Sequence, residues 1–302
     1  MIKAQRGTRI RSSVSDRVFM AFVHVLLVLS VLVVIYPLVY VLSASFSSPA
    51  AVLTGRVWFL PVEPTLFSFE TAFKFKGITS GYVNSLVYML GGTIVATILT
   101  TLASFPLSRR DFYGRGAFTA IFLFTMIFSG GMIPTYIQIK DYGLLNTRWA
   151  IILPNAVAIW LVIISRTYFQ QNIPEELYEA SELDGCSDIG FMLRVVLPLS
   201  APILAVVALN YAVWLWNSYF DALLYFTDRD LFPLQLVMRD IMIMSEIDVS
   251  NIASIESAIR KQGLSTVLKY ALIVMSAAPL LIAYPFVQKY FVRGMLVGAV
   301  KG

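Results

Sequence analysis

Residues 18–38 read VFMAFVHVLLVLSVLVVIYPL, and they lie inside the longer interval Val18 to Gly55, which contains no Asp, Glu, Lys or Arg. A helix needs about 20 mostly apolar residues to cross the hydrocarbon core of a bilayer. The run is too long for a cleavable signal peptide, and it continues apolar where a small-residue cleavage site would stand. We therefore predict a retained transmembrane helix over residues 18–45, kinked at Pro37.

Five further charge-poor apolar intervals follow along the chain. Together with the first they predict six transmembrane helices, over residues 18–45, 82–107, 116–139, 149–170, 200–225 and 268–291. The composition agrees, because the 302 residues are 58% hydrophobic and only 14% charged, with a mean hydropathy of +0.76. Soluble proteins are about 25% charged. We predict an all-α polytopic membrane protein, with residues 1–302 forming a single transmembrane domain.

Basic residues set the predicted orientation. Five precede the first helix and three more lie in the turn at 109–115: Lys3, Arg6, Arg9, Arg11, Arg17, Arg109, Arg110 and Arg115. Short loops rich in Lys and Arg stay in the cytoplasm, so both termini are predicted to be cytoplasmic. With this topology the inner segments carry the whole net charge of +5. The charge is therefore read as a topology signal, and no nucleic-acid partner is expected.

The chain has few residues suited to catalysis or metal binding. It has one cysteine, Cys186, and one histidine, His24, and Cys186 has no cysteine or histidine neighbour at metal-binding spacing. The phosphate-binding motif Gly-x-x-x-x-Gly-Lys-Ser/Thr does not occur in the sequence, so ATP is not expected to bind to this chain. We predict a non-catalytic protein with no metal site and no bound cofactor. A membrane-embedded enzyme would need convergent catalytic groups.

The predicted cytoplasmic loop at 171–199 is the most informative segment. Pro174 suits the start of a helix, which runs to Asp184 and stops at Gly185. A second helix starts at Ser187 and is predicted to end before Pro198. The first helix has five carboxylates and no basic residue: Glu175, Glu176, Glu179, Glu182 and Asp184. Helices that lie on lipid are rich in Lys and Arg, which favours a protein partner over an amphipathic connector at the membrane surface.

Several residues of this loop match a known pattern. Glu179-Ala180-Ser181, Asp184-Gly185 and Leu197-Pro198 resemble the EAA loop of binding-protein-dependent ABC importer permeases. The chain departs from the family at Ser181 and Cys186, where alanine is usual. The resemblance implies a type I importer permease fold and a coupling helix, formed by these residues, that seats in a groove of the ATPase.

The same resemblance implies partners and a location. The partners are a homologous second permease, two ATPase subunits that bind ATP and Mg, and an extracytoplasmic solute-binding protein. The location is the bacterial inner membrane, as a multi-pass protein in contact with the lipid bilayer. Further motifs look like the carbohydrate-uptake subgroup: Asn84-Ser85-Leu86, Pro106 to Arg109, Trp216-Asn217 and Gly294 to Gly302. Ser129 to Tyr136 is similar to a branch that imports complex oligosaccharides, such as alginate-type or pectin-derived sugars.

Polar and aromatic residues inside the spans are candidates for the translocation path. Sugars bind to aromatic faces and to amide or hydroxyl groups, and polar side chains in a span face a bundle interior or a cavity. The candidates are Asn84, Asn210, Trp214, Trp216, Asn217 and Tyr219. For Trp216 and Tyr219 an aromatic belt at the membrane interface is an equal alternative. The outer loops at 46–81 and 226–267 either dock the binding protein or cap the bundle.

Two other functions fit parts of the pattern. A permease of the same family for another solute, such as a polyamine or phosphate, would share the EAA loop. A secondary transporter would show inverted repeats and charged residues deep in its spans. No repeat stands out in the sequence, and no predicted span interior holds an acidic residue.

Overall fold

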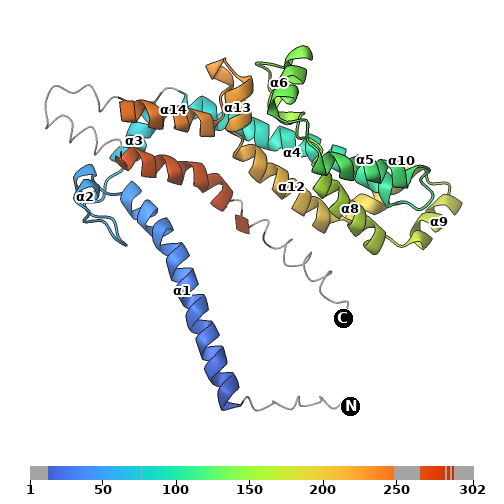
Figure 1. Cartoon of the computed structure of the whole chain (residues 1–302), viewed down its shortest axis with the longest axis horizontal. Coiled ribbons are helices and arrows are strands. Elements are labelled where there is room, and N and C mark those ends of the chain that lie inside the picture. The colour runs from blue at the N-terminus through green and yellow to red at the C-terminus, as the bar shows by residue number, and fades with distance from the viewer. Residues whose placement is uncertain (1–12, 76, 248–265, 283, 286–287, 289–302) are drawn as a thin grey trace. The chain divides into compact units, whose positions relative to one another are not determined.

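The structure is a computed structural model that describes residues 13–75, 77–247, 266–282, 284–285 and 288. The elements in these residues are all helical (Figure 1). The chain divides into two compact units, one of residues 1–71 with 252–274 and one of residues 72–251 with 275–302. The predicted all-α class is confirmed for the part of the chain that is described.

The first unit is dominated by helix α1, Val14–Ser45. Ser13 and Asp16 form a reciprocal capping box at its start, and the helix runs through Pro37 without a break. Helix α2, Pro49–Leu53, follows directly, and α3, Phe67–Lys74, starts at the end of this unit. A small core packs the end of α1 and α2 against Val267: Ala44, Ala51, Val52 and Val57. The predicted helix over 18–45 is thus confirmed, while its crossing of the membrane and the kink at Pro37 stay predictions.

The second unit is built around α4, Ile78–Ser108. It packs against α8, Ile159–Asn172, and α12, Ala201–Trp216. Gly92 lets α12 come close, because a Cβ there would lie 2.6 Å from Leu215 Cδ1. At the same helix contact the Tyr211 and Thr100 hydroxyl oxygens are 2.7 Å apart. Small and hydrogen-bonding residues of this kind are typical of helix contacts within membranes.

The second unit continues at the end predicted to be extracytoplasmic. The 3-10 turn η2, Arg229–Leu231, leads into α14, Leu234–Ile247, which packs on the start of α4. The Leu234 backbone N–H donates to Ser85 Oγ at 2.8 Å. Apolar residues on one face from Leu234 to Met244 predict a short helix from the sequence, and α14 confirms it.

Three predicted spans are broken in the structure. The one over 116–139 is two helices, α5, Arg115–Ile127, and α6, Met132–Asp141, bent by 114° at Gly130 and Gly131. Gly130-Gly131 followed by Pro134 predicts from the sequence that this helix ends or bends near its outer end, and the bend is confirmed. Gly131 has a φ of +84°, which glycine adopts without steric cost.

The span over 149–170 is likewise interrupted. Its parts are α7, Trp149–Ile152, and α8. Pro154 has no N–H to donate, and the Ala158 N–H donates to Tyr211 Oη at 2.8 Å instead of to a helical carbonyl. The prediction of one helix over 149–170 is therefore wrong, because regular helical hydrogen bonds are lost between α7 and α8.

The span over 200–225 ends early, at Trp216, and α13, Phe220–Tyr225, follows after a short break. The Asn217 side-chain amide donates to Val213 O at 2.8 Å, and Ser218 Oγ donates to Leu215 O at 2.6 Å. These side chains bond carbonyls near the end of α12, so they compete with continuation of the helix.

By length and composition, two helices among the described residues, α1 and α4, are able to cross a membrane. The number rises to four if each bent pair counts as one span; the pairs are α5 with α6, and residues 188–199 with α12. Thr266–Ile282 is a shorter apolar helix. Most of residues 283–291 of the sixth predicted span, residues 248–265 of the second outer loop, and Gly294 to Gly302 lie outside the described residues. The count of six spans stays a prediction.

Candidate functional sites

The cytoplasmic loop has the helix–glycine–helix form expected from its sequence. Helix α9, Glu175–Leu183, starts after Pro174 and ends at Asp184. Gly185 follows with a φ of +73°, a left-handed conformation that glycine reaches without steric cost. Ser187 caps α10, Asp188–Phe191, by accepting the Gly190 N–H at 3.2 Å. The predicted helix start, glycine stop and second start are confirmed.

The end of the second helix differs from the prediction. It does not end before Pro198 but continues through a π-helical turn, η1, Met192–Val196, into α11, Leu197–Leu199. A proline clashes with the carbonyl four residues back in a regular α-helix, whereas a π-helical turn bonds five residues apart. The wider turn therefore lets the helix accommodate Pro198.

Helix α9 is fastened to the rest of the unit mainly through Tyr178. The Arg109 guanidinium carbon lies 3.3 Å from the centre of the Tyr178 ring, a cation–π contact. Phe191 packs edge-on against the same ring, with centroids 5.3 Å apart. The Tyr178 hydroxyl donates to Asp188 Oδ1 at 2.7 Å. That bond, followed by burial, raises the pKa of Tyr178 to about 12, so the hydroxyl keeps its proton at neutral pH.

The other faces of α9 are open, and none of its residues is buried. Leu183, at the end of α9, is 90% exposed. Among the residues predicted to couple, Glu179, Ala180, Asp184, Gly185 and Pro198 are exposed, and Ser181 and Leu197 are half-buried. Ser181 Oγ donates to Tyr178 O at 2.8 Å. The structure thus places the EAA-like residues on a supported but uncovered helix.

The sequence analysis missed how the turn after α4 supports this loop. Arg109 was used as a topology signal and as part of a subgroup motif, yet it also caps α4 and contacts Tyr178. Arg110 lies 3.4 Å from Glu175, and Arg166 Nε donates to Leu107 O at 2.9 Å. A cavity of about 590 Å³ lies between this turn and the start of α9. No sequence spacing links residues 109 and 178, so only the fold brings them together.

A second cavity, of about 690 Å³, lies between α12 and the break that precedes α8. Four predicted path residues line it or an adjoining hollow of about 320 Å³: Asn210, Trp214, Asn217 and Tyr219. Asp221 lines the same space, as do Asn155 and Trp160, which were not predicted. The cavity wall thus combines indole rings with side-chain amides, the groups that bind sugar rings and hydroxyls.

The other two predicted path residues lie outside these cavities. Asn84 is buried, and its amide donates to the carbonyls of Asp230 and Phe232 at 2.7 and 3.1 Å. Trp216 is fully buried, and its indole N–H donates to Ser276 O at 3.0 Å. Asn84 therefore holds η2 and the start of α14, while Trp216 holds the helix at 266–282.

Comparison with known proteins decides what this arrangement belongs to. Residues 116–297 match the family described as "Binding-protein-dependent transport system inner membrane component". The chain belongs to this family. It is thus a non-catalytic permease subunit of a binding-protein-dependent ABC importer and an inner-membrane protein. Membership in such a system implies an ATPase and a binding protein as partners.

Three relatives cover almost the whole permease. Protein LplC of Bacillus subtilis (strain 168) is 40% identical over 89% of this chain and 90% of its own length. The polygalacturonan/rhamnogalacturonan transport system permease protein YtcP of the same organism is 37% identical over 95% of this chain and 99% of its own. A crystal structure of a bacterial ABC transporter involved in the import of the acidic polysaccharide alginate contains a chain that superposes with a TM-score of 0.83. That chain is 33% identical, and the match covers 93% of this chain and 99% of that one.

Proposed function

We propose that this permease carries oligosaccharides, of the pectic or alginate type, across the inner membrane. The observation that carries the proposal is the cavity lined by Trp160, Trp214, Asn210 and Asn217. Indole rings stack on the apolar faces of sugars, and amides bond their hydroxyls. The substrates in the names of a 37% identical relative and of the alginate importer support the same class. A permease of this family for another solute is the alternative.

The proposed topology has six spans with both termini in the cytoplasm, in a type I importer permease fold. Helices α1 and α4 supply two spans, and the bent pairs and the helix at 266–282 contribute to the others. The basic residues before α1 and in the turn at 109–115 support a cytoplasmic position for both. A homologous second permease completes the path through the membrane.

The proposed coupling element is α9 with Gly185. Two ATPase subunits bind ATP and Mg, and their closure moves α9, while this chain binds no nucleotide or cofactor. The exposed carboxylates of α9, together with Leu183, suit a groove with basic and apolar walls. Rigid-body movement of the helices then changes which side of the membrane reaches the cavity.

A reconstituted importer tests the substrate. The complex of both permeases and the ATPases is placed in proteoliposomes with the binding protein, and ATP hydrolysis is measured with neutral and with uronate-containing oligosaccharides. Stimulation by a pectic or alginate-type oligosaccharide is expected. If no sugar stimulates hydrolysis while another solute does, the alternative replaces the proposal.

Gly185→Arg tests the coupling element. A Cβ at Gly185 meets no atom within 4 Å, so a long side chain is accommodated by the permease itself but blocks a docking partner. The ATPase is expected to be lost on co-purification, while membrane insertion persists. Gly185→Ala carries the same backbone strain without the bulk and is the control. Normal co-purification with the arginine variant would contradict the coupling role.

A further inference from the structure

The segment that follows α1, residues 46–66, folds back against the end of that helix, and we name it the fold-back loop. Thr65 N–H donates to Phe46 O at 2.8 Å, and Ser48 N–H donates to Val62 O at 3.2 Å. Ser43 Oγ on α1 donates to Phe59 O at 2.7 Å. The loop is therefore ordered from both ends and is tied to the last turn of α1.

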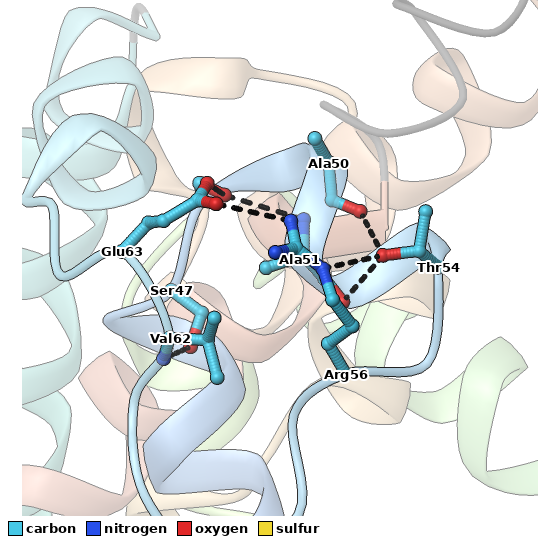
Figure 2. Close-up of polar contacts among 8 residues, drawn as sticks. Ser47, Ala50, Ala51, Thr54, Arg56, Val62 and Glu63 are labelled. Atoms are coloured by element: carbon cyan, nitrogen blue, oxygen red, sulfur yellow. Dashed lines mark hydrogen bonds and ion pairs between the residues drawn. The ribbon is translucent and has the colours of Figure 1, made fainter.

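Hydrogen bonds and an ion pair between polar side chains hold the two ends of the fold-back loop together at its base (Figure 2). Arg56 Nη2 pairs with Glu63 Oε1 at 3.0 Å, and Ser48 Oγ donates to Glu63 Oε2 at 2.6 Å. Ser47 Oγ accepts the Val62 N–H at 3.0 Å. The bond from Ser48, and then Arg56, hold the pKa of Glu63 below its usual range. The carboxylate therefore stays charged and paired at neutral pH.

The backbone at Glu63 is strained, with a φ of +53°. A residue with a side chain rarely adopts this left-handed conformation, and such outliers are retained where the surrounding structure enforces them. Here the bonds to Glu63 enforce the turn that returns the chain to α1. The strained backbone at Glu63 thus belongs to one particular conformation of the loop, which these bonds stabilise.

That shape presents three apolar side chains at its tip. Trp58, Phe59 and Leu60 are 62%, 61% and 76% exposed, while the preceding Val57 is buried in the core of the unit. The six residues between Arg56 and Glu63 carry no charge. A rigid exposed cluster of this kind indicates a surface that meets lipid or another protein.

The position of the tip along α1 indicates whether it lies next to lipid or in water. Twenty residues counted from Val18, the first after Arg17, reach Pro37, and this length of helix spans about 30 Å, the thickness of the hydrocarbon core. The side chain of Leu38 is still exposed, whereas Val39 to Val41 are half-buried and Ser43 to Ser45 are buried. The residues of α1 thus become buried within the protein just beyond the twenty-residue stretch that would span the hydrocarbon core. Phe59 lies against Tyr36 at that level, with ring centroids 5.4 Å apart.

We propose that the tip of the fold-back loop, Trp58-Phe59-Leu60, is inserted into the lipid interface of the outer leaflet and anchors the extracytoplasmic end of α1. Trp and Tyr concentrate at this depth in membranes. The charges at the base are paired. The carbonyl of Phe59 in the tip and the N–H of Val62 beside it are hydrogen-bonded inside the protein, as an environment poor in water requires. The assignment to the outer leaflet rests on the proposed cytoplasmic N-terminus.

Depth-dependent quenching of Trp58 fluorescence tests the anchor. The importer is reconstituted into phospholipids brominated near the top or near the end of the acyl chains, and the Trp58 signal is the difference between the wild type and Trp58→Phe. We expect quenching by the shallow bromines about twofold or more above that by the deep ones, and little quenching by aqueous iodide. Glu63→Ala removes the ion pair with Arg56 and the hydrogen bond from Ser48, and it should reduce the quenching by the shallow bromines.

Two results would overturn the anchor. Quenching by iodide and not by bromolipid places the tip in water, and protection from both places it under another protein chain. Quenching by bromolipid does not depend on which leaflet holds the tip. A failed anchor therefore leaves the proposed topology standing, and a reversed topology leaves the lipid contact standing.

Discussion

Helices α1 and α4 are nearly equal in length, at 32 and 31 residues, and both are apolar enough to cross a membrane. In the most apolar stretch of α1 none of the residues is buried, whereas 28% of the corresponding stretch of α4 is. The difference lies in the small and polar residues. One face of α4 carries six small or polar residues, and all six are buried: Gly81, Ser85, Gly92, Ala96, Thr100 and Ser104. Hydropathy therefore identifies a span, and small residues identify which span is packed within the chain.

The largest effect is expected from Gly92→Leu in α4. A Cβ there would lie 2.6 Å from Leu215 Cδ1, so the larger side chain must push α12 away. Overpacking of this kind costs about 1–3 kcal/mol or more. The variant should lose most of its monodisperse yield in detergent. Gly91→Leu is the matched control, because a Cβ at Gly91 meets no atom within 4 Å. Equal yields from the two variants would contradict the close contact of α4 with α12.

A smaller effect is expected from Tyr211→Phe. The hydroxyl of Tyr211 bonds Thr100 on α4 and accepts the Ala158 N–H before α8. Its loss leaves buried polar groups unpaired, which costs about 1–3 kcal/mol. The midpoint of thermal unfolding of the purified permease should fall by several degrees. An unchanged midpoint would mean that water replaces the hydroxyl.

A local effect is expected from Arg109→Ala at the end of α4. The substitution removes the cation–π contact with Tyr178, while the hydroxyl bond to Asp188 remains. Backbone amides of α9 should exchange hydrogen several-fold faster, with exchange in α12 unchanged. Arg110→Ala is the control, because that side chain is 82% exposed and its pair with Glu175 is long. Equal acceleration in both variants would show that charge, and not the ring contact, fastens α9.

The smallest effect is expected from Leu27→Ala in α1. Leu27 is 55% exposed and does not belong to the core that the described residues of its unit form. The thermal midpoint should move by less than the error of the measurement, because no cavity is created. A drop like that of a buried leucine would show that a partner subunit packs on this face of α1.

The sequence predicted the parts of this molecule that depend on local chemistry. The apolar runs predicted α1 and α4, and Pro174, Gly185 and Ser187 predicted the bounds of α9 and the start of α10. The breaks at Pro154 and Asn217 were missed, because they depend on Tyr211 and on side chains that bond their own helix. Asn84 and Trp216 were assigned to the path from residue type alone. Their hydrogen-bond partners are distant in the sequence, and no sequence pattern predicts these contacts: Asp230 and Phe232 for Asn84, and Ser276 for Trp216.

The stacking of Arg109 on Tyr178 has a mechanical consequence. Arg109 caps the end of α4, a helix of about 46 Å. Tyr178 makes the main contacts that hold α9, whose other faces are exposed. A displacement of α9 is therefore passed directly to the end of α4 by the contact between the Tyr178 ring and the Arg109 guanidinium. It does not have to pass along the 68 residues of backbone between these two positions. If α9 couples to the ATPase as proposed, its displacement on the cytoplasmic side would move α4 as a rigid body and so shift the opposite end of that helix as well.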